Sequence, residues 1–152
     1  MEQNTAITRE KMVELLNDDL AREYQAIIAY ITYSQIMKGA AYTDIARELE
    51  KHAGEELNHA LQIAKQIDYL GGTPVVAPKA VKLSDKPEEL LRFDLENERE
   101  TVAHYRVRIR QAESMGEYAL SETLRKIIQQ EQEHEIDLAD ALGIDVPEPK
   151  KL

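Results

Sequence analysis

Two halves of this 152-residue chain repeat one arrangement of acidic residues and histidines at an interval of 75 positions. Each half contains a glutamate and, 33 residues later, a Glu-x-x-His motif. Residues three positions apart share one face of an α-helix, so each motif can present its glutamate and its histidine together. The repeat therefore predicts two equivalent halves that meet at one site. The matching residues are Glu23, Glu56 and His59 in the first half and Glu98, Glu131 and His134 in the second.

Glycines and prolines divide the chain into four long segments with helical periodicity. Thr43 is expected to cap the second helix, and Asp85 with Glu88 the start of the third. Gly39, Gly116 and other glycines mark the places where helices end. The expected helices cover residues 8–38, 43–70, 86–115 and 117–142.

The lengths of the links predict how these helices are connected. Short links join the first helix to the second and the third to the fourth, which favours two antiparallel hairpins. The middle link of about 14 residues can stretch about 46 Å, enough to run along the second helix of about 42 Å. We therefore expect an all-α four-helix bundle with one long crossover between helices two and three. This domain spans residues 1–143, and residues 144–152 form a short C-terminal tail.

Each expected helix has one inward stripe that is apolar at its ends and carries carboxylate or imidazole groups at its centre. Glu23 and Glu56 lie about 24 and 20 Å from the first turn, so they are level, as are Glu98 and Glu131 about the last turn. An unpaired carboxylate in a core costs several kcal/mol, so four of them predict bound cations. Cysteine is absent, so carboxylates and imidazoles must supply the ligands.

Such a donor set predicts a carboxylate-bridged pair of iron or manganese ions. We expect Glu56 and Glu131 to bridge the two metals, and His59 and His134 to ligate one metal each. Glu23 and Glu98 then become terminal ligands.

Further side chains on the same stripes are candidates for supporting roles. Tyr30 and its counterpart Tyr105 can hydrogen-bond ligand carboxylates or donate an electron during oxidation. The alternative is simple packing with a satisfied hydroxyl. Tyr30 is the candidate catalytic residue. Asp19 and Asp94, one turn before a ligand glutamate, are candidates to accept the free ring N–H of a ligating histidine, and simple surface carboxylates are the alternative.

His52 breaks the repeat, because its counterpart is Ile127. A hydrogen-bonded core histidine is the favoured interpretation, and a route for incoming iron is the alternative.

The charge balance excludes several classes of partner. Asp and Glu number 29 against 19 Lys and Arg, giving a net charge of −10. Such a charge repels nucleic acid and anionic membranes and attracts cations. No segment has the ~20 apolar residues of a membrane span, and the polar start MEQNTAITREK lacks the apolar stretch of a secretory signal. The cytoplasm is the expected location.

These motifs resemble those of the ferritin superfamily, most closely the bacterioferritins. The likeness runs from Thr8 to Gly143 and includes both Glu-x-x-His motifs, the LGGTP at the start of the crossover and the LLRFDLENE of the third helix. The resemblance implies a ferritin-like bundle and a ferroxidase that oxidises Fe(II) with O₂ or H₂O₂ at a di-iron centre. It also implies storage of ferric mineral in a homo-oligomeric cage. The six repeated residues match the family's ligands, and Tyr30 matches the tyrosine beside the centre.

The chain departs from the bacterioferritin pattern in two places. Leu57 stands where bacterioferritins carry the methionine that binds haem, so haem is not expected. Only nine residues follow Gly143, where the family has a short fifth helix. A dimer, a shell of 12 subunits and a cage of 24 therefore all stay open.

Two other functions use the same donors. One is a different di-metal redox enzyme, such as a manganese catalase or a rubrerythrin-like peroxidase, although the latter usually adds a cysteine-ligated domain. The other is a bundle that binds metal without turnover.

Overall fold

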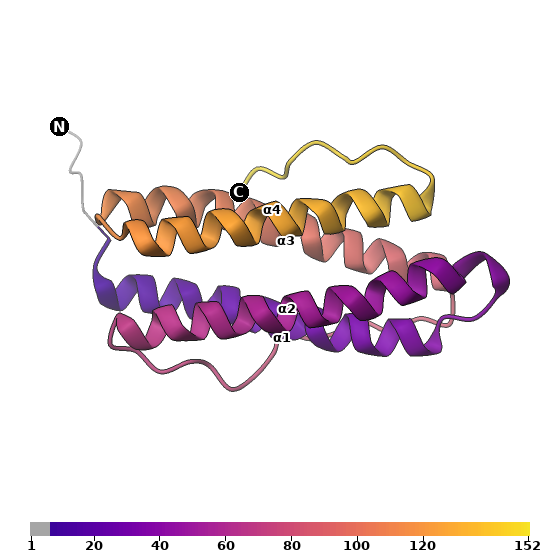
Figure 1. Cartoon of the computed structure of the whole chain (residues 1–152), viewed down its shortest axis with the longest axis horizontal. Coiled ribbons are helices and arrows are strands. Elements are labelled where there is room, and N and C mark those ends of the chain that lie inside the picture. The colour runs from indigo at the N-terminus through magenta and orange to yellow at the C-terminus, as the bar shows by residue number, and fades with distance from the viewer. Residues whose placement is uncertain (1–6) are drawn as a thin grey trace.

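The computed structural model describes residues 7–152 and shows, over that range, four long helices and no strand (Figure 1). A short 3₁₀ turn, η1 (Ala40–Tyr42), precedes the second helix. The predicted helices are confirmed to within two residues at every end. The predicted start of the domain at residue 1 lies outside the described residues. The helices are α1 (Arg9–Ile36), α2 (Thr43–Tyr69), α3 (Pro87–Ser114) and α4 (Tyr118–Leu142).

The helices form the two predicted hairpins, α1 with α2 and α3 with α4, and α1 also packs on α3 and α2 on α4. The link between the hairpins runs back along the bundle beside α1 (Figure 1). Three side chains of α1 donate hydrogen bonds to backbone carbonyls along this link: Asn17 to Thr73, Gln25 to Ala80 and Tyr33 to Lys82. The predicted all-α four-helix bundle with one long crossover is therefore confirmed.

Helix starts follow the sequence only in part. Thr8 caps α1 by accepting a hydrogen bond from the backbone N–H of Lys11. The prediction for Thr43 was wrong, because η1 leads directly into α2 and Thr43 already has helical φ and ψ of −59° and −46°. The cap predicted for Asp85 is also wrong. The hydroxyl of Ser84 instead accepts from the Lys86 N–H, at 3.0 Å, just before α3.

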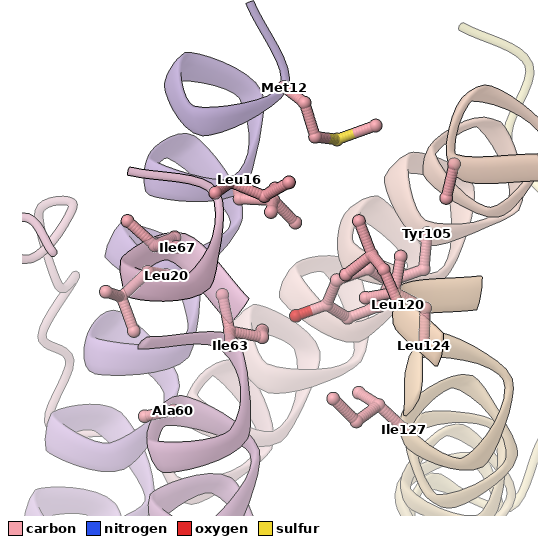
Figure 2. Packing of buried hydrophobic residues seen from close by; sticks show 12 residues of the cluster. Met12, Leu16, Leu20, Ala60, Ile63, Ile67, Tyr105, Leu120, Leu124 and Ile127 are labelled. Atoms are coloured by element: carbon pink, nitrogen blue, oxygen red, sulfur yellow. The ribbon is translucent and has the colours of Figure 1, made fainter. Parts of the chain in front are cut away.

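The buried apolar residues form two clusters at different heights of the bundle. The first joins the beginning of α1 to the end of α2 and includes Leu16, Ile63 and Leu124, which point into the space between the hairpins (Figure 2). The second lies toward the other end and includes Tyr33, Leu91 and Leu138. Along every helix, the stretch between these two clusters includes at least one buried carboxylate or imidazole group, so a polar layer crosses the middle of the core.

The C-terminal tail, residues 144–152, has no helix and is held against α3. The guanidinium of Arg99 donates to the Glu148 carbonyl at 3.0 Å, and the Lys150 ammonium lies 3.1 Å from a Glu100 carboxylate oxygen. Over the described residues, no helix is both long and apolar enough to cross a membrane.

Candidate metal centre

The polar layer contains all six residues of the repeated motif, and each is at most 2% exposed. One side chain comes from α1, two from α2, one from α3 and two from α4. The helical spacing of each Glu-x-x-His motif turns both side chains of that motif toward the bundle axis. The structure therefore brings together every metal ligand that the sequence predicted, namely Glu23, Glu56, His59, Glu98, Glu131 and His134.

These side chains form two overlapping groups of possible ligands. In each group, one donor atom from every residue lies within 4.8 Å of the others. Glu56 and Glu131 belong to both groups, which is the arrangement that two bridging carboxylates require. The first group adds Glu23 and His59, and the second adds Glu98 and His134.

Each histidine directs Nδ1 into the layer. Nδ1 of His59 lies 2.6 Å from Oε1 of Glu131 and 3.6 Å from Oε2 of Glu23. Nδ1 of His134 lies 2.9 Å from Oε1 of Glu56 and 3.5 Å from Oε1 of Glu98. The two halves thus have the same geometry, with each histidine facing the bridging glutamate of the opposite hairpin.

The donor atoms lack the partners that buried polar groups normally have. Nδ1 of both histidines, both carboxylate oxygens of Glu131 and one oxygen each of Glu23, Glu56 and Glu98 make no hydrogen bond within residues 7–152. Over the same range, no lysine or arginine forms an ion pair with any of the four glutamates. Four carboxylates balance the charge of two divalent cations, so the layer suits two metal ions.

The pKa values show how the layer behaves without a cation. Burial, reinforced by the neighbouring carboxylates, raises the pKa values of Glu56 and Glu131 well above their usual range. Burial also opposes ionisation of Glu98, but the close approach of Glu131 and of the His134 imidazole, together with the Tyr30 hydroxyl, lowers its pKa to about 2. Burial likewise disfavours charged histidines, yet the carboxylates raise the pKa of His59 to about 11 and that of His134 to about 9. Protons therefore supply the positive charge that metal ions would bring.

The two tyrosines hold the outer glutamates across the bundle. The Tyr30 hydroxyl donates to Oε1 of Glu98 at 2.6 Å, and the Tyr105 hydroxyl donates to Oε1 of Glu23 at 2.5 Å. Burial raises the pKa of both phenols well above 10, so both stay protonated. The Tyr30 ring also meets the His134 ring edge-on, with centroids 5.9 Å apart.

The outer ring nitrogens of His59 and His134 lie near Gln130 and Glu55, so the prediction that Asp19 and Asp94 accept from them was wrong. Nε2 of His59 lies 2.5 Å from Oε1 of Gln130, whose amide donates to Glu55 at 2.7 Å. Glu55 in turn lies 3.6 Å from Nε2 of His134. Glu55 and Gln130 are themselves 75 positions apart, directly before the bridging glutamates. The same 75-residue interval could therefore have identified Glu55 and Gln130 from the sequence.

Asp19 forms ion pairs with two arginines and therefore does not accept a hydrogen bond from a histidine. It is buried between Arg22, to which it is ion-paired, and Arg108, whose Nε lies 2.7 Å from Oδ2. Asp94 is buried as well, and over the described residues its Oδ2 has no hydrogen-bond partner. Burial raises the pKa of Asp94 well above its usual range.

His52 lies on the edge of the layer. Its Nε2 is 3.1 Å from Oδ2 of Asp137, which confirms the favoured prediction of a hydrogen-bonded core histidine. Its ring stacks on His134 with centroids 4.0 Å apart, and Tyr30 meets it edge-on at 5.0 Å.

Comparisons with known proteins agree with this architecture. Bacterioferritin of Brucella melitensis is 25% identical over 142 residues, covering 88% of this chain and 87% of that protein. A ferritin-like, diiron-carboxylate protein from Bacillus anthracis superposes with a TM-score of 0.85 at 33% identity, over 88% of this chain and 96% of the other. The bacterioferritin-related protein of Bacteroides fragilis, a dodecameric thioferritin, has a TM-score of 0.83 at 28% identity, over 91% and 88% of the two chains. The pattern of the Ferritin-like domain matches residues 13–145, and the chain therefore belongs to the ferritin-like family.

Proposed function

We propose that this protein is a ferroxidase that oxidises Fe(II) with O₂ or H₂O₂ at a di-iron centre and thereby stores and detoxifies iron. Its ferritin-like family and its bacterioferritin relatives support a role in iron storage or iron oxidation in general. The observation that carries the finer proposal is the pair of overlapping donor groups that share Glu56 and Glu131 in a buried layer.

The proposed roles of the side chains follow from their positions. Glu56 and Glu131 would be shared by two iron ions, while His59 and His134 would each hold one of them. Glu23 and Glu98 bind one iron each and are held in place by the tyrosine hydroxyls. Oxygen and imidazole donors accept Fe(II), and the carboxylates stabilise the Fe(III) product.

Two bound Fe(II) ions can supply two electrons at once. Such a pair would reduce one H₂O₂ to two hydroxide ions, or one O₂ to peroxide, and would itself become Fe(III). We assign Tyr30 a catalytic role as an additional electron donor, because it joins Glu98 by a hydrogen bond and touches the His134 ring. Its phenolic proton can pass to Glu98 when the electron leaves.

We further propose a homo-oligomer, since the Bacteroides fragilis relative is dodecameric. Light scattering coupled to size exclusion distinguishes a dimer, a shell of 12 and a cage of 24. Haem is not part of the proposal, because Leu57 replaces the expected methionine and is 53% exposed on α2.

An aerobic Fe(II) titration tests the function directly. We expect rapid oxidation in the wild type and loss of the rapid phase in Glu131→Ala and His59→Ala. Glu133→Ala, on the exposed face of the same helix as Glu131, should behave as the wild type. Oxidation no faster than in buffer would contradict the proposal. Soluble iron retained well beyond two per chain indicates storage.

The same donors suit manganese, so the alternative function of a manganese catalase is tested by activity assays as well. Rapid H₂O₂ disproportionation by the manganese-loaded protein, together with slow iron oxidation, would identify a catalase instead. Tight metal binding with neither activity would identify a bundle that only binds metal.

A further inference from the structure

A second group of possible ligands lies beside the candidate di-iron centre, between α2 and α4. One donor atom each from Glu48, His52 and Asp137 lies within 4.8 Å of the others. His52 is 1% exposed, whereas the two carboxylates are partly exposed and reach solvent. We propose that these three residues form a third divalent-cation site, separate from the two cations of the central layer.

The surroundings of this group favour a cation. A groove of about 400 Å³ between the start of α2 and the end of α4 is lined by four carboxylates, those of Asp44, Glu48, Asp137 and Asp140. Among the described residues, none of those that line it is a lysine or arginine. The ammonium of Lys51 lies 3.8 Å from Glu48 but is largely exposed, so it can swing away. Two carboxylates and an imidazole are donors that Fe(II), Co(II) and Zn(II) all accept.

The hydrogen bonding of the His52 imidazole is incomplete. Its Nε2 contacts Asp137, but its Nδ1 is buried and has no hydrogen-bond partner in the described part of the chain. Buried polar atoms that serve packing alone are nearly always satisfied. The ring is thus aimed at the carboxylates of the groove through Nε2 and is held there by only one hydrogen bond.

The internal repeat gives independent support. The counterparts of the three residues in the other half of the chain are Thr123, Ile127 and Gln62. None of these is a carboxylate or an imidazole, and Ile127 belongs to the apolar core. The equivalent position in the other half is thus filled by an apolar side chain, and the third site would exist on one side of the pseudo-symmetric layer only.

The position of the site suggests its use. The His52 ring stacks directly on His134, one of the proposed ligands of the centre. A cation held by Glu48, His52 and Asp137 would therefore lie beside the acidic groove and one imidazole away from the centre. We infer that this site loads Fe(II) into the centre, a role that rests on the proposed ferroxidase function.

Co(II) binding to the metal-free protein, followed by calorimetry and by visible absorption, tests the site without any turnover. We expect three Co(II) per wild-type chain and two in Asp137→Asn or Glu48→Gln. Glu50→Gln, the same change on an exposed face of α2, should still bind three. His52→Ile, which copies the residue of the other half, should also bind two. Two Co(II) in the wild type, or three in both carboxamide variants, would overturn the proposal.

A second pair of variants separates this site from the central one. Glu131→Ala should retain one Co(II) that disappears when Asp137→Asn is added. Three Co(II) bound without iron oxidation would support the third site and contradict the ferroxidase function. In a wild type that oxidises iron, Asp137→Asn should raise the Fe(II) concentration needed for half-maximal rate several-fold. An unchanged Fe(II) dependence would overturn the loading role.

Discussion

The hydroxyl groups of Tyr30 and Tyr105 occupy equivalent positions, each on a glutamate of the opposite hairpin. Their surroundings nevertheless differ, because only Tyr30 has ring contacts with histidines among the described aromatic pairs. The sequence predicted the hydrogen bonds to carboxylates as one of two options. It singled out Tyr30 as the catalytic candidate but could not predict the ring contacts of Tyr30 with His52 and His134, because these depend on how the helices pack.

Replacing each tyrosine by phenylalanine separates a redox role from a positioning role. Tyr30→Phe and Tyr105→Phe should each lose one buried hydrogen bond, worth about 1 kcal/mol of stability. Only Tyr30→Phe should slow iron oxidation and abolish a tyrosyl radical signal in rapid-freeze electron paramagnetic resonance. Equal slowing in both variants would show that the hydroxyls only orient the glutamates.

Gln130 holds the outer nitrogen of His59 and connects it to Glu55. Removal of such a partner typically lowers metal affinity 10- to 100-fold, at order of magnitude, because the ring loses its orientation. We expect Gln130→Ala to weaken Co(II) binding at the centre by roughly this factor, as measured in competition with a chelator. Gln129→Ala, an exposed neighbour on the same helix, is the control and should bind as the wild type. Equal affinities in the two variants would contradict the role of Gln130.

At the scale of helices, α1 and α3 are tied by charge as well as by apolar packing. The Asp19 carboxylate accepts hydrogen bonds from two nitrogens of Arg108 on α3 and from one nitrogen of Arg22 on its own helix. All three residues are buried. Periodicity predicted the helices, the hairpins and the crossover, because apolar spacing and turn residues are local signals. It assigned no inward role to Arg22 or Arg108, because ion pairs between distant segments leave no local pattern.

Asp19→Ala should therefore be strongly destabilising. It leaves two buried guanidinium groups without their shared carboxylate, and breaking a buried pair of this kind costs about 3–5 kcal/mol. Asp18→Ala removes a neighbouring carboxylate that is 45% exposed and pairs with Arg22 and Lys79. Such exposed pairs contribute about 1 kcal/mol or less. Urea denaturation of the two metal-free variants measures both values, and a similar loss in each would contradict this account.

On the scale of the whole molecule, the bundle places charged groups where an ordinary core is apolar. The two apolar clusters on either side provide most of the packing, and the polar layer separates them. The repeat in the sequence was sufficient to predict which six side chains gather in that layer. The third group at Glu48, His52 and Asp137 could not be predicted, because Asp137 reaches it from a different helix and outside any motif.

The metal-free protein should lose stability as the pH rises above about 6.5. The pKa values of His59 and His134 are raised to about 11 and about 9 in the folded state, against 6.5 when unfolded. Between these limits the folded chain binds more protons than the unfolded chain, so the free energy of unfolding falls with pH. The raised pKa values of Glu56 and Glu131 act in the same direction.

Metal binding should reverse this trend, because cations displace the protons and bind more tightly as the pH rises. Urea denaturation at pH 6.5 and 8.5, with and without Co(II), measures both slopes. In metal-free His59→Ala, the free energy of unfolding should fall less steeply with pH than in the metal-free wild type. A metal-free protein that is more stable at pH 8.5 than at pH 6.5 would contradict the assignment of protons to this layer.

The overlap of the two ligand groups has a consequence for how the molecule could be divided. Each hairpin provides three ligands to one group and lends a single bridging carboxylate to the other, so neither hairpin contains a complete site. If the backbone were cut within the crossover, the apolar clusters would still join the two fragments, and bound cations would strengthen their association. Because the exchange is reciprocal, one such hairpin paired with a second copy of itself would already enclose two metal ions.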